Sequence, residues 1–340
     1  MRQGLGFVIA TMLIACSSTT IPGTPSGDQP DAPGGGGSDG TPADAAIIVE
    51  PPTFTVVSPT IDVTAKSDST YCYYFHMPNT ANVSIKKWAS HLTDGATQLT
   101  LFLTAIDKQT SGTMPATPCG MKDIGDTLVW SYSADIPDAE MVLPADDGTG
   151  RPVGMAVRAG QPAMLQIHVV NPGDQSISAH VELAGYAHPD GIAVTLAAPY
   201  VTYDPGVHLD PAPTPAMPTA DTVSGNCSVD PAAKFFSISV HTFKQATHTF
   251  VKDKDTVVFD NVNWQTPRPA SWNTTPFFSF ASQKISYQCE YTNPNSYSIS
   301  TGDRAATDEM CVTVGYYFPV EESPDHFSAG QYCLNSRIIR

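Results

Sequence analysis

Short segments with a two-residue hydrophobic period run through this chain from residue 52 onward, and they restrict what it can fold into. They are rich in Val, Thr, Ile and aromatic residues, and Pro, Gly, Asn and Asp separate them. No segment has the period and caps of a convincing helix. The predicted strands are residues 53–57, 97–103, 164–170, 176–183, 192–196, 235–243, 256–259, 285–291 and 311–318. Many short strands favour β-sandwiches, so we expect an all-β fold of two tandem jelly-roll-like β-sandwich domains.

Composition supports this fold class and excludes one class of partner. The 340 residues include 30 Pro and 25 Gly, which oppose a helical bundle, and a hydrophobic content of 41%, which supports a packed core. Lys and Arg number 17 against 33 Asp and Glu, a formal net charge of -16. An acidic surface repels phosphate backbones, so we expect no nucleic-acid partner.

The first residues have the pattern of a targeting segment. Arg2 precedes an apolar run at residues 5–13 that is too short to cross a bilayer. The run ends in Leu13-Ile14-Ala15-Cys16, which resembles the lipobox of bacterial lipoproteins. Residues 1–15 are therefore predicted to be a lipoprotein signal peptide, with Cys16 as the site of lipid attachment. The prediction is a secreted, membrane-anchored bacterial lipoprotein, in the outer membrane or on the periplasmic face; the alternative is an ordinary signal peptide followed by a chance cysteine.

Two proline- and glycine-rich stretches divide the rest of the chain. Residues 16–50 contain four consecutive Gly at 34–37 and no packable segment, which is typical of a flexible linker. Six prolines lie between Pro199 and Pro218. A proline removes a donor from a β-ladder, so residues 199–221 are predicted to be a connection between strands of different domains. The domains are then residues 51–198 and 222–340.

The cysteine count fits an exported protein. Setting Cys16 aside leaves six cysteines, an even number that favours disulfides in an oxidising compartment. Confining the bridges to the domains forces Cys72–Cys119 in the first domain. The same condition leaves three possible pairings in the second domain. Those cysteines are Cys227, Cys289, Cys311 and Cys333.

The C-terminal half carries motifs of a known family. Asp308-Glu309-Met310-Cys311 is followed by Tyr316-Tyr317-Phe318-Pro319, and residues 286–293 read Ser-Tyr-Gln-Cys-Glu-Tyr-Thr-Asn. This pattern resembles the end of the copper type II, ascorbate-dependent monooxygenases, which include the peptidylglycine α-hydroxylating and dopamine β-hydroxylating enzymes. In that family the methionine of the Asp-Glu-Met-Cys segment binds the oxygen-binding copper, which here corresponds to Met310. Val240-His241-Thr242-Phe243 stands where the family has His-x-His.

The N-terminal half resembles the same family. Residues 71–78 are similar to the opening strand of the family's first domain. Residues 160–168 match its Gly-…-Leu-Gln-x-His strand, whose histidine, here His168, binds the electron-transfer copper. The resemblance implies an electron-transfer-copper domain followed by an oxygen-binding-copper domain, with copper as cofactor and ascorbate as reductant. It also implies the disulfides Cys72–Cys119, Cys289–Cys311 and Cys227–Cys333.

The copper ligands of the family are only partly present. An active enzyme needs three protein donors for each copper, and imidazole and thioether are the ligands that suit this metal. Phe243 replaces the second histidine of His-x-His, and the family's adjacent His-His pair falls near Thr97-Gln98. Three of six donors remain: His168, His241 and Met310. A hairpin through residues 244–247 offers His248 as a further donor beside Phe243, and His76 or His91 are candidates beside His168.

Three functions follow from this pattern. The first is a copper type II monooxygenase-like lipoprotein that is degenerate and keeps at most one weak copper site. The second is an active monooxygenase that hydroxylates an exported small molecule or peptide. The third is a non-catalytic structural or binding lipoprotein on the same scaffold. We expect a monomer, and the sequence does not identify the substrate.

Overall fold

The computed structural model describes residues 50–115, 128–302, 304–321 and 330–339. These ranges consist of strands, turns and loops, so the predicted all-β class is confirmed. Within them, no helix is long and apolar enough to cross a membrane. The predicted signal peptide, Cys16 and residues 16–49 of the predicted linker lie outside the described residues. Glu50–Arg340 form one compact unit.

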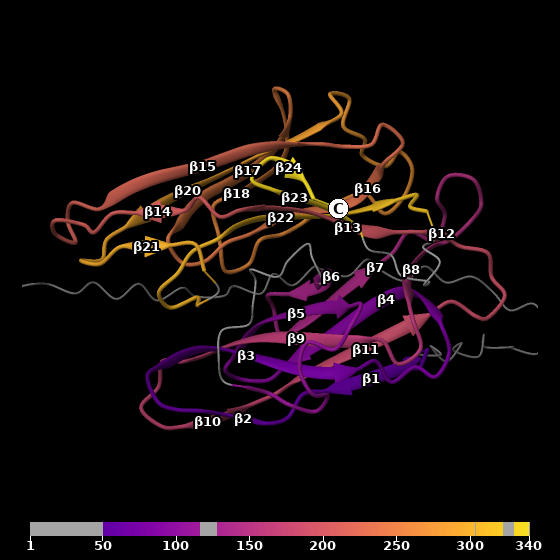
Figure 1. Cartoon of the computed structure of the whole chain (residues 1–340), viewed down its shortest axis with the longest axis horizontal. Helices are drawn as coiled ribbons and strands as arrows, with labels where there is room; N and C mark the ends of the chain where they lie inside the picture. The colour runs from indigo at the N-terminus through magenta and orange to yellow at the C-terminus, as the bar shows by residue number, and fades with distance from the viewer. Residues whose placement is uncertain (1–49, 116–127, 303, 322–329, 340) are drawn as a thin grey trace, which may run out of the picture. The chain divides into compact units, whose positions relative to one another are not determined.

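The first sandwich is built from two main sheets, drawn in indigo through magenta to salmon (Figure 1). One sheet has the order β1-β11-β4-β8-β12, with β7 also paired to β4: Phe54–Val57, Val181–Ala187, Val83–Leu92, Val153–Val157, Thr195–Leu196 and Asp138–Val142. The other has the order β3-β9-β5-β6: Ser67–His76, Pro162–Asn171, Ala96–Thr104 and Leu128–Ala134. A short pair joins β10 (Ile177–Ala179) to β2 (Ile61–Val63).

The core of the first sandwich lies between these two sheets. Trp88 on β4 and Tyr132 on β6 are both fully buried, with ring centroids 6.4 Å apart. The Tyr132 hydroxyl is 2.9 Å from Ser90 Oγ and donates to the carbonyl of Ala139 at 3.0 Å. A buried hydroxyl must find partners, and these partners come from the opposite sheet, so they fix how the two sheets face each other.

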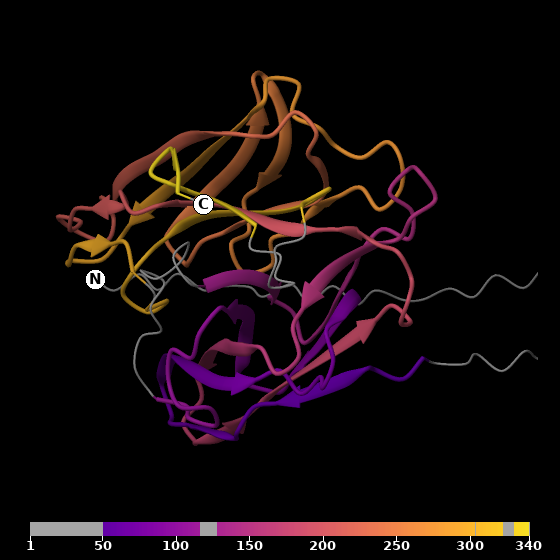
Figure 2. The ribbon, with the colours of Figure 1, turned by 45° about the vertical axis from the view of Figure 1, so that its right-hand side comes forward.

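The second sandwich also has two main sheets, drawn in salmon through orange to yellow (Figures 1 and 2). One has the order β19-β16-β22-β13-β23-β24: Ala270–Ser271, Lys234–His241, Cys311–Phe318, Ala198–Asp204, Gln331–Leu334 and Arg337–Ile338. The other has the order β15-β20-β17-β18: Thr219–Ser228, Lys284–Asn293, Ala246–Asp253 and Thr256–Asn261. A short pair joins β14 (His208–Leu209) to β21 (Ile299–Ser300).

Two disulfides connect the sheets of the second sandwich. Cys289 on β20 is bonded to Cys311 on β22, with Cα atoms 6.0 Å apart. Cys227 on β15 is bonded to Cys333 on β23, with Cα atoms 6.2 Å apart. Both predicted pairs of this domain are therefore confirmed. Cys119, the predicted partner of Cys72, lies outside the described residues, so that pair stays a prediction.

Strand β22 is buried on both faces, which explains why its sequence is apolar apart from Thr313. Its even-numbered residues Val312, Val314, Tyr316 and Phe318 belong to the same hydrophobic cluster as the core of the first sandwich. Cys311 and Tyr317 belong to the core between β22's own sheet and the β15-β20-β17-β18 sheet. A further link between the sandwiches is the hydrogen bond that the amide of Trp130 donates to the Tyr332 hydroxyl at 2.9 Å.

The proline-rich segment 199–221 differs from its prediction, because it contains strands. Strand β13 lies between β22 and β23 and pairs with both. Pro199 stands at the start of β13 and Pro205 follows its last residue, Asp204. The prolines therefore delimit this strand and do not remove donors from its middle, which is the position where proline is tolerated.

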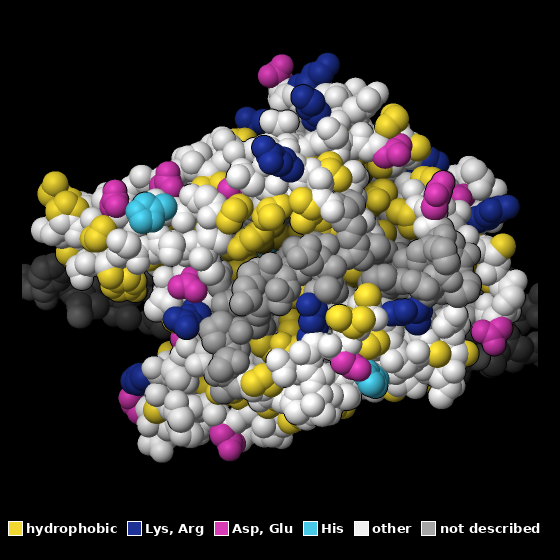
Figure 3. All heavy atoms as spheres, viewed as in Figure 1, with side chains coloured by type: hydrophobic (Ala, Val, Ile, Leu, Met, Phe, Trp, Pro, Cys, Tyr) yellow, Lys and Arg dark blue, Asp and Glu magenta, His cyan; other side chains and the backbone are white. Residues whose placement is uncertain are grey.

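Most of the other predicted strands agree with the structure at their centres and differ at their ends, whereas only residues 195–196 of the strand predicted at 192–196 form a strand, β12. Residues 311–318 are the bounds of β22, whereas residues 176–183 divide into β10 and β11, which pair in different sheets. The segment predicted at 235–243 ends at His241, where the chain leaves the sheet. On the face drawn in Figure 3, charged side chains are dispersed over the surface and do not form one continuous patch.

Candidate functional site

His168, the predicted ligand of the electron-transfer copper, is held by protein groups at both ring nitrogens. It lies on β9 between β3 and β5, opposite Thr70 on one side and Gln98 on the other. Nε2 is 2.7 Å from Asp68 Oδ1, and Nδ1 is 2.9 Å from Thr97 Oγ1. Asp68 is two residues from Thr70 along β3, so it is the diagonal cross-strand neighbour of His168.

A β-bulge directs Thr97 toward His168. Ala96 pairs with Val169 and Gln98 pairs with His168, so Thr97 has no residue opposite it in the ladder. An extra residue of this kind re-aims its side chain and is common beside active sites. Thr97 is exposed, whereas His168 is 9% exposed. The bulge thus places the exposed Thr97 hydroxyl within hydrogen-bond distance of the buried His168 ring.

His241, the predicted ligand of the second copper, is also held by a neighbour. It is the last residue of β16, and its ring packs edge-on against Trp130 and Phe243, with centroids 5.5 and 5.6 Å away. The Gln98 amide nitrogen donates to His241 Nδ1 at 3.0 Å and to Asp135 Oδ1 at 2.5 Å. Gln98 therefore connects the two sandwiches.

Burial shifts the ionisation of this group. Desolvation, with a smaller contribution from nearby His168, lowers the pKa of His241 to about 4. Desolvation raises the pKa of Asp135 to about 6, against the opposing hydrogen bond from Gln98. At pH 7 His241 is consequently neutral and Asp135 is ionised.

These hydrogen bonds decide whether the histidines suit a metal. A neutral imidazole has one nitrogen lone pair, and the other nitrogen carries a proton. In His241 the lone pair is on Nδ1 and accepts from Gln98. In His168 the Nε2 proton is directed at the Asp68 carboxylate, so the Nδ1 lone pair accepts from Thr97. As they are held, these residues do not fit copper, because neither imidazole has a lone pair left for a metal.

Met310 and Glu309 stabilise the loop that follows His241. Met310 is buried in the same hydrophobic cluster as Phe243. The Glu309 carboxylate is fully buried and accepts the amides of Phe243, Gln245 and Met310 at 3.0, 2.7 and 3.2 Å. Desolvation raises the pKa of Glu309 to about 7, although the three amides act in the opposite direction. Glu309 thus positions the loop through these three hydrogen bonds.

The two histidine networks meet at a cavity of about 460 Å³. Asp68, Thr97, Gln98, Asp135 and His168 line it from the first sandwich. The second sandwich contributes residues 242–244, including Phe243 and Lys244, and the segment 264–266, including Trp264. His241 and Met310 do not line this cavity, so Gln98 stands between His241 and the open space.

The alternative histidine ligands are elsewhere. His248 lies on β17, in a different sheet from His241, with Nε2 2.8 Å from Asp260 and Nδ1 3.5 Å from Glu290. The ring of His76 is 2.6 Å from Asp107, and that of His91 is 2.7 Å from Asp138. The structure brings none of the three into contact with His168 or His241. No cluster of three or more His, Cys, Asp or Glu side chains with metal-binding geometry occurs among the described residues.

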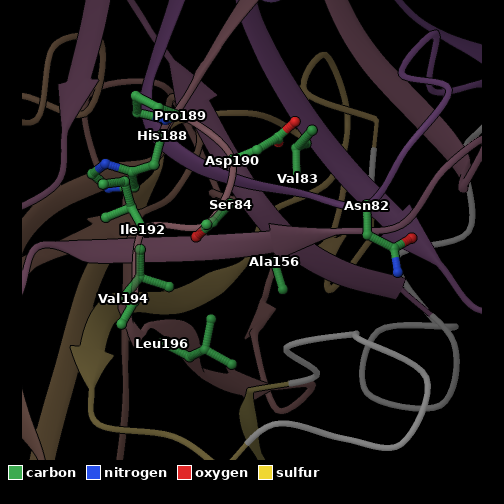
Figure 4. Close-up of a pocket in the computed structure, with 12 residues that line it drawn as sticks. Asn82, Val83, Ser84, Ala156, His188, Pro189, Asp190, Ile192, Val194 and Leu196 are labelled. Carbon is green, nitrogen blue, oxygen red and sulfur yellow. The ribbon is translucent and has the colours of Figure 1, made fainter.

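A second cavity, of about 380 Å³, lies in the first sandwich (Figure 4). Ser84, His188 and Asp190 line it, which are the residue types of a hydrolytic triad. His188 Nε2 is 3.0 Å from the carbonyl of Val153, and the Ser84 hydroxyl is buried with no hydrogen-bond partner in the described structure. In Figure 4 the His188 ring and the Asp190 carboxylate point in different directions. These residues share a cavity without forming a relay.

The sequence identifies part of the first cavity. His168 and His241 are predicted as functional, and both belong to the networks at its wall. Thr97 and Gln98 are noted only as positions without imidazole, although their hydroxyl and amide are the groups that satisfy the two histidines. Asp68 and Asp135 have no sequence signal, because Asp68 on β3 and Asp135, which follows β6, are far from the histidines along the chain.

Comparisons with known proteins leave the family open. No protein-family model matches the chain, and no curated protein matches it. Among solved structures, the chain is similar to the major capsid protein P2 of bacteriophage PM2, with 6% identity, a TM-score of 0.29, and coverage of 81% of this chain and 100% of the other. It is also similar to a peptide-N(4)-(N-acetyl-β-D-glucosaminyl) asparagine amidase, with 9% identity, a TM-score of 0.33, and coverage of 79% and 98%. Similarities at this level carry no argument about this chain.

Proposed function

We propose that this chain is an exported, lipid-anchored relative of the copper monooxygenases that binds a small organic molecule in the cavity lined by Asp68, Thr97, Asp135, His168 and Trp264. The family relation rests on the motifs around Met310 and His168. The anchor rests on the lipobox-like sequence that ends at Cys16, and two disulfides agree with an oxidising compartment. The cavity is proposed to act without copper.

One observation carries the proposal: the histidines are already hydrogen-bonded where a metal would bind. By the resemblance the family's His-His pair falls near Thr97-Gln98, and the side chains of these two residues bond to His168 Nδ1 and His241 Nδ1. Phe243 replaces a further donor and contacts His241 through its ring. Hydroxylation by the family's chemistry needs two loaded coppers, so this arrangement favours a binding protein over an active monooxygenase.

The lining of the cavity indicates a class of ligand. Trp264 and Phe243 offer aromatic surface, which binds the apolar body of a small molecule. Asp68 and Asp135 each use Oδ1 within the histidine networks, and Oδ2 of each has no hydrogen bond from another described residue. Free carboxylate oxygens accept hydrogen bonds, and the chain's charge of -16 attracts cations. The ligand is therefore a small molecule with an aromatic body and an amine or hydroxyl donor.

Benzylamine is a minimal probe of this class. We expect it to change Trp fluorescence with a Kd on the order of 1 mM, with benzyl alcohol weaker and benzoate weakest, because only the amine is attracted to both carboxylates. Trp264→Phe should remove the fluorescence change, and Trp272→Phe is the matched control. Equal binding of benzylamine and benzoate, or a signal that persists in Trp264→Phe, would exclude this cavity as the site.

The copper content of the protein is a second test of the same proposal, because the proposal requires that no copper is bound. The purified protein, exposed to Cu(I) and then dialysed, should retain much less than one equivalent, because no imidazole lone pair is available. Two retained equivalents would restore the active-monooxygenase hypothesis, and one equivalent would support the degenerate single-site protein.

A further inference from the structure

We propose that Thr97, His168 and Asp68 form a hydrolytic relay, in which Thr97 is the nucleophile, His168 the general base and Asp68 the residue that orients the base. The substrate class is a small carboxylic ester that fits the same cavity. This activity goes beyond ligand binding, although it rests on the proposed use of that cavity, and the experiment below separates the two.

The contacts of His168 are those of a nucleophile–base–acid chain. Thr97 Oγ1 is 2.9 Å from Nδ1, and Asp68 Oδ1 is 2.7 Å from Nε2. Both distances lie within the range in which a positioned base accepts a proton from a nucleophile. The hydroxyl is also 3.3 Å from the carbonyl of His168, a longer contact than that to Nδ1. Relative to serine-protease triads the two ring nitrogens exchange roles, which changes neither the proton path nor the need for a carboxylate partner.

The access of the three groups differs in the way that catalysis requires. Thr97 is exposed and lines the cavity, so its hydroxyl is accessible to a bound molecule. His168 is buried, and the Asp68 side chain is 30% exposed. The β-bulge at Thr97 holds the hydroxyl at this point, and it is an independent sign that the ladder is distorted here to place one side chain.

Other Asp–His pairs in the chain lack the nucleophile. His76 pairs with Asp107, His91 with Asp138 and His248 with Asp260. In the part of the chain that the structure describes, no Ser or Thr hydroxyl is bonded to the ring of any of these histidines. A carboxylate beside a histidine is therefore common on this surface, whereas the complete chain with a hydroxyl occurs at the cavity.

The reaction balances with an ester and water alone. Thr97 Oγ1 attacks the ester carbonyl carbon while its proton moves to His168 Nδ1, and the carbonyl oxygen becomes an oxyanion. Lys244 also lines the cavity and is the cation that stabilises this charge. The bond from carbon to the leaving oxygen then breaks, and Nδ1 returns its proton to that oxygen. Water cleaves the acyl-Thr97 ester by the same path, releasing the carboxylic acid, and Asp68 holds the Nε2 side of the ring throughout.

The test uses p-nitrophenyl acetate on the purified full-length protein. Release of p-nitrophenolate is followed, and peptide mass spectrometry after an acid quench locates the acetyl group. We expect acetylation at Thr97 and a rate that falls about 100-fold in Thr97→Val and His168→Gln, with Thr97→Ser retaining activity. Asp68→Asn should lower the rate and shift the rise of its pH profile, since a merely structural acid would leave the profile in place. His248→Gln is the matched control for hydrolysis by surface imidazoles.

Each outcome decides between the alternatives. Thr97→Val is nearly isosteric, and a melting temperature equal to that of the wild type confirms that it is folded. If folded Thr97→Val keeps the wild-type rate, or if acetyl groups appear only on Lys side chains, the relay does not exist. If the protein binds benzylamine but shows neither acetyl-Thr97 nor turnover, the hydrolytic inference fails and the binding function stands.

Discussion

The buried Glu309 makes stability depend on pH in a direction opposite to that of most acids. Burial raises the pKa of Glu309 from 4.5 to about 7 in the folded protein, despite the amides of Phe243, Gln245 and Met310. The folded state therefore holds a proton that the unfolded state releases at lower pH. Stability from this group is complete below pH 4.5 and is lost as the pH rises to 7. The pKa difference is 7 minus 4.5, and each pH unit is worth 1.36 kcal/mol, so the loss is about 3 kcal/mol.

Glu309→Gln removes this titration and keeps a side chain of similar size. The variant is destabilised at every pH, because its amide nitrogen faces backbone N–H donors that the carboxylate accepted. The cost should be largest near pH 4.5 and smaller by about 3 kcal/mol at pH 8. Guanidinium unfolding of wild type and variant at several pH values measures it, and their difference cancels every other titrating group. A difference that is constant from pH 4.5 to pH 8 would refute the reasoning.

Two further predictions concern the disulfides and the proposed absence of a copper site. The chain-entropy model gives about 5 kcal/mol for Cys227–Cys333, with a sequence separation of 106, and about 3 kcal/mol for Cys289–Cys311, with a separation of 22. Replacing each pair by Ala should reproduce this order in guanidinium unfolding, and a reversed order would contradict the loop-length argument. The double variant Phe243→His with Gln98→Ala should bind Cu(I) at least tenfold more tightly than wild type, because it adds an imidazole beside His241 and frees the Nδ1 lone pair. Competition with a chromogenic chelator measures this, Phe243→Leu with Gln98→Ala is the control, and unchanged affinity would show that the pocket has repacked.

The strands could be predicted because half-buried strands alternate and fully buried strands are continuously apolar. The predicted bounds of β22 match the structure to the residue, since the strand has cores on both faces and Pro319 follows its last residue. Strand β13 was missed because its prolines were interpreted as interruptions. Whether a proline interrupts or ends a strand depends on which neighbours need its missing donor, and those neighbours, β22 and β23, come more than 100 residues later.

The candidate site could be predicted only as a set of histidines. The resemblance placed His168 and His241 at functional positions, and both lie at the two networks. Their partners could not be predicted, because Asp68 and His168 are 100 residues apart, and Gln98 and His241 are 143 residues apart. The bulge at Thr97 could not be predicted from the sequence either, since it consists of one residue without a partner in the β-ladder.

A buried imidazole that binds no metal needs a protein partner for its nitrogen lone pair. A buried imidazole whose lone pair has no partner costs about 1–3 kcal/mol. Thr97 and Gln98, near which the resemblance places the family's His-His pair, meet this requirement, since each supplies a hydrogen-bond donor. The same hydrogen bonds fix the tautomer of each imidazole. At His168 the fixed tautomer has its lone pair toward an exposed hydroxyl and its proton toward a carboxylate, which is the state that a general base needs. Asp68 and Thr97 thus make His168 a poorer metal ligand and a better base by the same two hydrogen bonds.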